Sequence, residues 1–348
     1  MYNCNINYYD EKKLVIMSDN YNIIKKCQAY FGIIYKLIKD SNHDSWKIKI
    51  ECDGIPEDKT KLILENTVDN TLQTFEHNIQ GYMFNGTWYL DVDKKWLLYI
   101  DRDKKNIIIW TSNPNEAFII TRKIIREITK HELKRLGTIA IHSSAIEYNN
   151  NAIIFCGDKG DGKTTTLLNL LNTKRFKFIS NDLSVLTTDN IILPVASGVN
   201  VGLGTLYGIE NYHKLIPNKY QKLLVDEKYR EENKFNKFYF DLEDFVDLFD
   251  VEVSKGAPLK SIIFVKFNLN NSGWSIKRMS NCESEYNLRR NMILEDEDHH
   301  DWLKLSTDNN LELDIRVNDI LKKVKCYELK FDSSGIDFHM FLRHLSLD

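Results

Sequence analysis

The chain has 348 residues, of which 43% are hydrophobic, and its net charge is −3. This length is enough for about two domains, each with its own core. The balanced charge and a pI near 6.3 favour neither nucleic acid nor an anionic membrane as a partner. The six cysteines are scattered without a Cys-x-x-Cys pair, which argues against a zinc site and against a disulfide framework.

The start of the sequence lacks a basic region followed by an apolar one, so we expect no signal peptide. The longest apolar runs, such as residues 261–265, are too short to span a bilayer. These features predict a soluble, cytoplasmic protein.

Residues 1–112 are expected to form a small α+β domain. Three β-branched and aromatic runs, at 88–92, 96–100 and 106–110, are separated by charged turns and predict an antiparallel meander. A weaker pattern predicts a helix within residues 21–39.

A long helix is predicted to open a second domain, which we expect to cover residues 113–348. Asn113 suits its N-cap, Pro114 its first turn and Glu116 the partner in a capping box. Apolar side chains then follow at helical spacing, and Gly137 is a suitable stop.

The most informative segment is 157–164, which matches the phosphate-binding pattern G-x-x-x-x-G-K-[ST]. An apolar strand is predicted before it, at 152–156, and a helix after it, at 164–171. Glycines let backbone N–H groups converge on phosphate oxygens, and the helix start adds the positive end of a dipole. Lys163 can reach the β- and γ-phosphates, and the Thr164 hydroxyl can hold Mg²⁺. The candidate nucleotide-binding residues are Gly157, Asp158, Lys159, Gly160, Asp161, Gly162, Lys163, Thr164 and Thr165.

Some side chains of this loop are not expected to touch phosphate. Asp158 and Asp161 are predicted to face solvent, and Lys159 could either assist phosphate binding or stay in water. The alternative interpretation of the whole segment is a flexible Gly/Asp turn, which the flanking strand and helix disfavour.

Further elements are predicted along the rest of the second domain. A strand over 176–179 is expected to end at Asn181 and Asp182, and residues 218–236 are expected to be a charged surface excursion. The remaining predictions are a strand over 138–148, a hairpin over 185–193, an extended segment over 199–206, a strand over 258–267, a charged helix over 280–305, a strand over 327–331 and a helix ending near 345.

Two charged segments could contribute to a site. Residues 295–301 have the composition of a metal cluster, although a solvated helix end is favoured and a lid over a substrate is an alternative. Lys228 and Arg230, in the charged excursion, could clamp phosphates.

Three features around the loop resemble the HPr kinase/phosphorylase-like proteins, a branch of the phosphoenolpyruvate carboxykinase-like P-loop kinases. His142 precedes Gly157 by the spacing of the family histidine, Asn181 and Asp182 stand close to the place of the family Asp pair, and a Gly-containing segment follows at 201–206. The resemblance covers residues 113 to about 206 well, is looser to about 345 and is absent over 1–111. It is strongest to divergent members associated with natural-product clusters, including kinases of lasso-peptide precursors.

This resemblance implies ATP and Mg²⁺ as cofactors. It implies catalytic roles for Asp182, His142, Lys163 and Asn181, and metal ligation by Thr164 and Asp182. Asn181 departs from the family pattern, because the corresponding Asp is the usual proton acceptor and an amide cannot take a proton. Either Asp182 then fills both roles, or His142 assists, or the chemistry is weak.

The combined hypothesis is an α/β protein with an HPr kinase-like P-loop domain, built on a mixed sheet and preceded by a smaller α+β domain that recognises the substrate. It would transfer the γ-phosphoryl group of ATP to a hydroxyl, of a peptide Ser or of a small molecule. The alternative from another class is a non-catalytic ATP-binding sensor or scaffold. We expect no nucleic-acid or membrane partner, and a homo-oligomer is left open.

Overall fold

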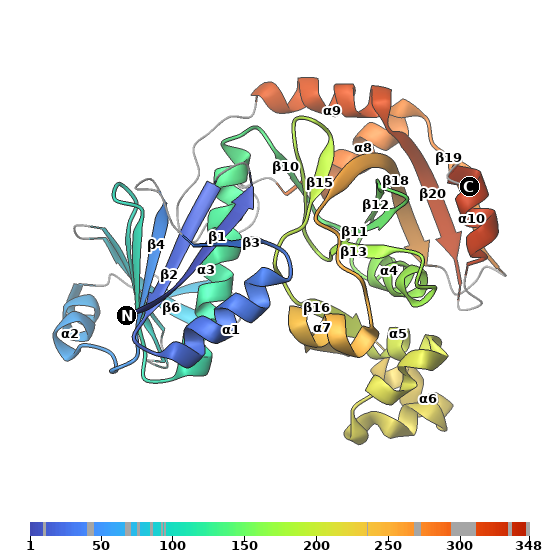
Figure 1. Cartoon of the computed structure of the whole chain (residues 1–348). Helices are drawn as coiled ribbons and strands as arrows, with labels where there is room; N and C mark the ends of the chain where they lie inside the picture. Colours follow the sequence, from blue (N-terminus) through green and yellow to red (C-terminus); the bar gives the residue numbers. More distant parts are fainter. Residues whose placement is uncertain are drawn as a thin grey trace. The chain divides into compact units, whose positions relative to one another are not determined.

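The structure is a computed structural model. It describes residues 1–9, 12–39, 45–66, 71–74, 77–83, 86–91, 93, 95–234, 236–267, 273–293, 311–332 and 336–345. The chain forms two compact units, Met1–Leu133 with Leu294–Thr307 and Lys134–Ile293 with Asp308–Asp348 (Figure 1).

The units divide after Leu133 and not at the expected boundary between residues 112 and 113. The long helix at 114–134, apart from its last residue, therefore belongs to the first unit. Its contacts give the reason: the ring of Phe118 lies 5.5 Å from that of Tyr30, and Glu132 accepts a hydrogen bond from the indole of Trp46 at 3.0 Å.

The first unit is built on a nine-stranded sheet in the order β3-β1-β2-β4-β9-β8-β7-β6-β5. The pairs β2–β4 and β4–β9 are parallel and the other neighbours are antiparallel, so the expected meander is confirmed as β7–β9. Its elements are β1 (Tyr2–Tyr9), β2 (Lys12–Ser18), α1 (Tyr21–Gly32), β3 (Lys36–Ile38), β4 (Trp46–Glu51), α2 (Glu57–Asn66), β5 (Thr71–Thr74), β6 (His77–Met83), β7 (Thr87–Asp91), β8 (Leu97–Asp101), β9 (Asn106–Trp110) and α3 (Pro114–Lys134).

The helix predicted within residues 21–39 is shorter than expected. α1 ends at Gly32, and residues 36–38 form β3, which pairs with β1. Burial in the unit follows the strand period, since Trp46, Ile48 and Ile50 of β4 are buried while the residues between them are more exposed.

The second unit is built on a mixed sheet, as predicted, in the order β10-β14-β15-β18-β12-β11-β13, with β20 also paired to β18 and β19 to β20. β18 is parallel to β12 and to β20, and β11 is antiparallel to β12 and β13. The strands are β10 (Ile139–Ile141), β11 (Ser143–Tyr148), β12 (Asn151–Cys156), β13 (Lys177–Ser180), β14 (Ser184–Leu186), β15 (Ile191–Leu193), β16 (Val199–Gly202), β17 (Lys237–Phe240), β18 (Ala257–Phe267), β19 (Ser275–Arg278) and β20 (Lys325–Phe331).

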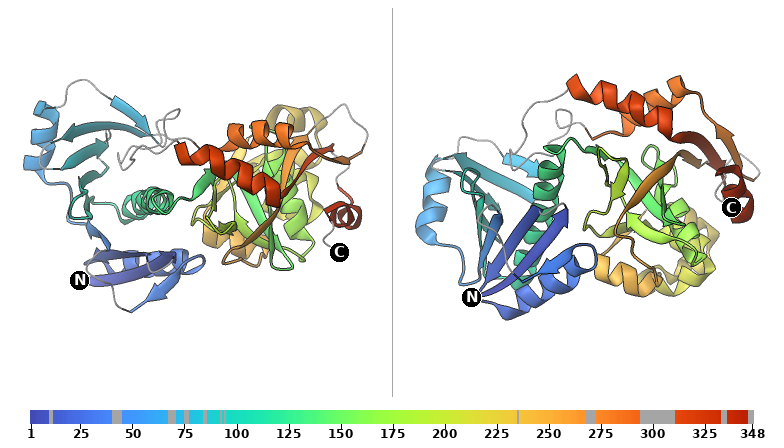
Figure 2. Two further views of the ribbon diagram at one scale, coloured as in Figure 1. Left: turned by 90° about the horizontal axis from the view of Figure 1, so that it is seen from above. Right: turned by 45° about the horizontal axis from the view of Figure 1, so that its top comes forward.

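Helices cover both faces of this sheet. The α-helices are α4 (Lys163–Asn172), α5 (Leu203–Gly208), α6 (Glu227–Asn233), α7 (Leu242–Phe249), α8 (Asn281–Asn291), α9 (Leu311–Lys323) and α10 (Phe338–Leu345), and the 3₁₀ helices are η1 (Glu210–Leu215) and η2 (Asn218–Leu224). α8 and α9 lie side by side (Figure 2). Leu288 of α8 and Val317 of α9 share a core with Ile154 of β12.

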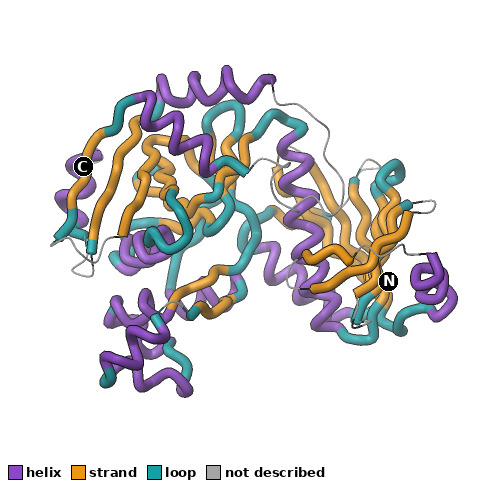
Figure 3. The backbone as a smooth tube through the Cα atoms, turned by 180° about the vertical axis from the view of Figure 1, so that it is seen from behind, coloured by secondary structure: helices purple, strands orange, loops and turns teal. Residues whose placement is uncertain are grey.

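The other face of β12 is covered by α4. Ile153 and Phe155 alternate with Ile154 along the strand, so they point to the opposite face, and α4 packs against β11 and β12. The mixed sheet of the unit therefore lies between helical layers (Figure 3). This arrangement places the loop between β12 and α4 at the end of a central strand.

Two expectations about the second unit are wrong in detail. The strand predicted over 138–148 is broken at His142, because β10 pairs with β14 while β11 pairs with β12 and β13. The extended segment predicted over 199–206 turns into α5 at Leu203. The hairpin over 185–193 and the strands over 258–267 and 327–331 are confirmed.

The charged helix predicted over 280–305 is seen as α8, which ends at Asn291. The acidic and histidine-rich residues 295–301 lie outside the described residues. Among the described helices, none is both long enough and apolar enough to cross a membrane.

Candidate active site

The loop between β12 and α4 has the backbone conformation that its glycines predict. Gly160 and Gly162 have φ angles of 97° and 92°, in the left-handed region that side chains with a Cβ rarely adopt. A Cβ at Gly162 would also lie 2.8 Å from Cζ of Phe331, a ring buried in the core. Glycine at 162 is therefore required both by conformation and by space.

The start of α4 is open to an anion. Gly162 is the N-cap residue, and no side chain caps the helix there. Since the first four N–H groups of an α-helix have no partner within the helix, those after Gly162 are available to phosphate oxygens. The positive end of the helix dipole points the same way.

Lys163 folds back onto the loop. Its Nζ donates to the carbonyl oxygens of Gly157 and Asp158 at 2.6 and 3.1 Å, and only 8% of the residue is exposed. Burial lowers the pKa of its ammonium, and the negative charge of Asp182 opposes this by raising the pKa. The loop carbonyls thus hold the cation where the pattern predicts it to meet a phosphate.

The two aspartates of the loop behave differently. The Asp158 side chain is 68% exposed, in line with the prediction, and pairs with Arg290 at 3.1 Å. Asp161 is half-buried, and its carboxylate accepts the N–H of Asp158 at 2.7 Å, so it closes the loop and does not simply face solvent. Lys159 is exposed.

Asn181 lies directly beside the candidate metal ligand of the loop. Its Oδ1 accepts from Ser144 Oγ at 2.8 Å and from Thr164 Oγ1 at 3.3 Å, and the residue is 1% exposed. Its Nδ2 is buried with no hydrogen-bond partner among the described residues. It is thus Asn181, and not Asp182, whose side chain meets Thr164.

Asp182 and His142 form the other half of the site. Asp182 has a φ angle of 64°, which turns its backbone so that its carbonyl oxygen lies 3.0 Å from His142 Nδ1. Since a carbonyl only accepts, Nδ1 carries the proton and Nε2 of the neutral ring is left as an acceptor. Burial, and next the charge of Lys163, lower the pKa of His142, which keeps the ring neutral at pH 7.

The donor set fits a magnesium ion bound together with phosphates. Among the described residues, no group of three His, Cys, Asp or Glu side chains lies close enough to hold a metal ion by itself. Mg²⁺ commonly takes only one or two protein ligands and fills its other positions with phosphate oxygens and water. The Thr164 hydroxyl beside the Asn181 amide oxygen suits that mode, and the charge of the Asp182 carboxylate acts on Lys163 of the same loop.

The segment that follows β16 contacts α4 near both ends of the helix, and at the C-terminal end Asn211 Nδ2 donates to Asn172 Oδ1 at 3.0 Å. Thr165 Oγ1 lies 2.8 Å from Thr205 Oγ1 of α5. Arg230 is used within the excursion, since its guanidinium lies 3.8 Å from the ring centre of Tyr207 and its Nε donates to the Leu223 carbonyl. These contacts argue against Arg230 as a phosphate clamp, whereas Lys228 is exposed.

The structure thus brings His142, Lys163, Thr164, Asn181 and Asp182 together, all within the second unit. Sequence reasoning missed three neighbours: Ser144, Arg290 and Asn291. Asn291 binds Gly157 although 134 positions separate them, and no pattern in the sequence connects two such residues.

Comparison with known proteins adds a weak likeness. No family model matches the chain, and no curated protein sequence matches it. Among solved structures, the HPr(Ser) kinase/phosphatase from Coxiella burnetii aligns with 60% of this chain and 87% of its own, at 12% sequence identity and a TM-score of 0.26. A TM-score this low carries no argument about fold or activity.

Proposed function

We propose that the chain is an ATP-dependent kinase that transfers the γ-phosphoryl group to a hydroxyl acceptor. The observation that carries the proposal is the loop from Gly157 to Thr164. It combines glycines with positive φ, an uncapped helix start, and Lys163 held against the loop carbonyls. Backbone N–H groups and a lysine arranged in this way are typical of nucleotide-phosphate sites.

The residues around the loop would divide the work of phosphoryl transfer. Mg²⁺ bound with ATP supplies charge neutralisation at the phosphates. Thr164 would hold the ion, with Asn181 orienting the Thr164 hydroxyl. The acceptor proton would go to the Asp182 carboxylate, or to Nε2 of His142, which is neutral and has its other nitrogen fixed by the Asp182 carbonyl.

The acceptor that we propose is a Ser of a precursor peptide, and a small-molecule hydroxyl is the near alternative. Both follow from the resemblance of His142 and the loop to the natural-product branch of the HPr kinase-like proteins. The first unit, which has a core of its own, would recognise the acceptor.

A non-catalytic ATP sensor is the second candidate, and Asn181 favours it. The amide stands where the family has a carboxylate that accepts the substrate proton. Its oxygen already accepts hydrogen bonds from two hydroxyl groups of the protein, those of Ser144 and Thr164. A sensor would bind Mg-ATP through the same loop without needing a base.

Both candidate functions require that the loop binds Mg-ATP, and calorimetry measures this binding. Lys163→Ala is expected to lose most of the affinity, because it removes the cation that faces the phosphates, while the protein stays folded. Unchanged affinity in the variant would overturn the phosphate-site assignment. Transfer of labelled γ-phosphate to an acceptor, measured on the wild-type protein, then separates the kinase from the sensor.

A further inference from the structure

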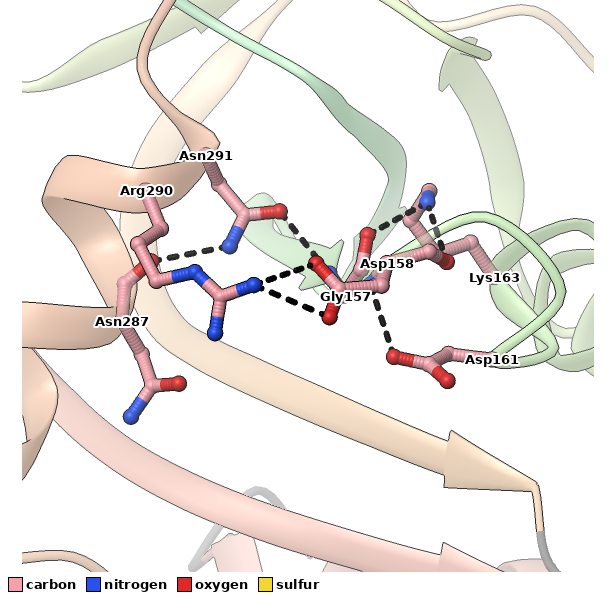
Figure 4. A network of polar contacts seen from close by, with 7 residues as sticks. All are labelled: Gly157, Asp158, Asp161, Lys163, Asn287, Arg290 and Asn291. Atoms are coloured by element: carbon pink, nitrogen blue, oxygen red, sulfur yellow. Dashed lines mark hydrogen bonds and ion pairs between the residues drawn. The ribbon is translucent and has the colours of Figure 1, made fainter.

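The last turn of α8 reaches the nucleotide loop through Asn291. This residue is 7% exposed, and its Oδ1 accepts the backbone N–H of Gly157 at 3.0 Å. Its Nδ2 donates to the carbonyl oxygen of Asn287, one turn earlier in the helix, at 2.8 Å. The amide is therefore fixed in one orientation by a donor and an acceptor (Figure 4).

The same residue also holds the His142 segment. The carbonyl oxygen of Asn291 accepts the backbone N–H of His142 at 2.6 Å. The pairing continues on both sides: Ile141 bridges to Met292, and the N–H of Ile293 donates to the carbonyl oxygen of Ala140 at 3.0 Å. Asn291 thus contacts the first glycine of the loop through its side chain and His142, one of the two candidate bases, through its backbone.

The contacts continue from Asn291 to the phosphate-facing cation. Gly157, whose N–H Asn291 accepts, uses its carbonyl oxygen to accept from Lys163 Nζ at 2.6 Å. The N–H and the carbonyl belong to the two peptide groups that meet at the Gly157 Cα, so the contact with Asn291 anchors the residue whose carbonyl holds the lysine. Figure 4 shows the path from α8 through Gly157 to Lys163.

The neighbouring ion pair plays a smaller part. Arg290 and Asp158 lie 3.1 Å apart, but their side chains are 51% and 68% exposed. Exposed pairs contribute little because water and salt screen them. Of these two contacts from α8 to the loop, the buried amide of Asn291 is therefore the stronger one.

We infer that Asn291 is a positioning residue for this site, which sets the loop, Lys163 and His142 in their relative places before a nucleotide binds. The role as a positioning residue for phosphoryl transfer rests on the proposed function. The contact with Gly157 itself does not, and the two can be tested separately.

The sequence allows a direct test of the contact, because Cys156-Gly157 is its one Cys-Gly pair and Ile141-His142 its one Ile-His pair. Labelling the carbonyl of Cys together with the amide nitrogen of Gly isolates the Gly157 N–H in an NMR spectrum. Labelling the Ile carbonyl with the His nitrogen isolates that of His142. In Asn291→Ala, without nucleotide, solvent exchange of the Gly157 amide is expected to rise by several-fold to about tenfold, as for the loss of one hydrogen bond.

Matched variants separate positioning from general stability. Asn287→Ala keeps the backbone carbonyl that Asn291 uses, so it is expected to leave Gly157 exchange and Mg-ATP affinity unchanged. Asn291→Leu keeps a side chain of similar size but has no acceptor, so Gly157 is expected to lose its protection as in Asn291→Ala. If Asn291→Ala does not fold, this second variant decides, and wild-type Gly157 protection in it overturns the inference.

Mg-ATP affinity and the single-turnover transfer rate complete the test. Asn291→Ala is expected to weaken Mg-ATP binding by up to about tenfold, because the loop and Lys163 lose their side-chain anchor. It should slow transfer at saturating Mg-ATP by less, because the backbone carbonyl of residue 291 still accepts the N–H of His142. A variant that loses thermal stability but keeps wild-type Gly157 exchange and affinity overturns the inference. If the wild-type protein binds no Mg-ATP, the proposed function fails, while the exchange of Gly157 still decides whether Asn291 holds the loop.

Discussion

Two adjacent residues that follow β13, Asn181 and Asp182, make different contacts in the candidate site. Asn181 points its side chain inward to Ser144 and Thr164 and is almost fully buried. Asp182 takes a left-handed backbone conformation, presents its carbonyl to His142, and influences the pKa of Lys163 through its charge. The negative charge of the pair therefore comes only from Asp182.

Asp182→Asn is the substitution that tests the role of Asp182. Asparagine tolerates a φ of 64° about as well as aspartate does, so the backbone is expected to stay in place. If Asp182 accepts the proton of the acceptor hydroxyl, transfer in a single turnover should fall at least ~10²-fold, by more than Mg-ATP affinity does. Wild-type transfer by Asp182→Asn together with an inactive His142→Ala would assign the base to His142.

His142 is expected to make folding sensitive to acid. Its pKa is lowered by burial and by Lys163, so the folded state disfavours the charged ring. The stability that this contributes is complete above the unfolded pKa of about 6.5 and is lost as the pH falls through the lower folded value. Without nucleotide or metal, the free energy of unfolding should drop more steeply below pH 6.5 in the wild type than in His142→Asn, which keeps a donor for the Asp182 carbonyl. Parallel curves for the two proteins would contradict this.

At the scale of elements, the loop between β12 and α4 depends on glycine for two separable reasons. Gly160 and Gly162 both have positive φ, but only at Gly162 would a Cβ meet another atom, Cζ of Phe331 at 2.8 Å. A side chain at Gly160 would therefore lower stability only through its backbone conformation, whereas one at Gly162 would also collide with the Phe331 ring.

Gly160→Ala is expected to lower the free energy of unfolding by about 1 kcal/mol, the cost of a left-handed non-glycine residue. Gly162→Ala should cost more, about 2–3 kcal/mol, because the Phe331 ring must also shift. Chemical denaturation of both variants measures the difference. Equal losses would mean that the ring moves without cost and that only conformation matters at Gly162.

Some elements of the second unit can be predicted from the sequence, and others cannot. The strand, glycine loop and helix from Asn151 to Asn172 follow a local pattern of apolar runs and glycines, and the prediction was correct. The break at His142 was missed because the alternation of side chains continues through it. Only the change of pairing partner, from β14 to β12 and β13, interrupts the strand. Such partners are set by packing far along the chain, as is the contact between Asn291 and Gly157.

At the scale of the whole molecule, every residue of the candidate site lies in one of the two units. His142, Lys163, Asn181 and Asn291 all belong to the unit that includes Lys134–Ile293. The first unit has its own sheet and a buried cluster of Ile63, Leu90 and Leu97. The proposed nucleotide binding by the second unit and the proposed acceptor recognition by the first can therefore be tested separately in the intact chain.

Hydrogen exchange of the intact protein, followed by mass spectrometry, tests this separation. Mg-ATP at a hundred times its Kd stabilises the folded state that binds it by about 2.7 kcal/mol. The protection is expected in peptides covering 139–144, 157–166 and 177–183, because phosphate contacts would order the loop and the strand ends around it. Peptides from 1–113 should exchange at the same rate with and without nucleotide. The matched control is Lys163→Ala, in which the peptides covering 139–144, 157–166 and 177–183 should no longer be protected by Mg-ATP. Protection that appears mainly in the first unit, and that survives in Lys163→Ala, would place the nucleotide elsewhere and remove the basis for assigning the chemistry to the loop.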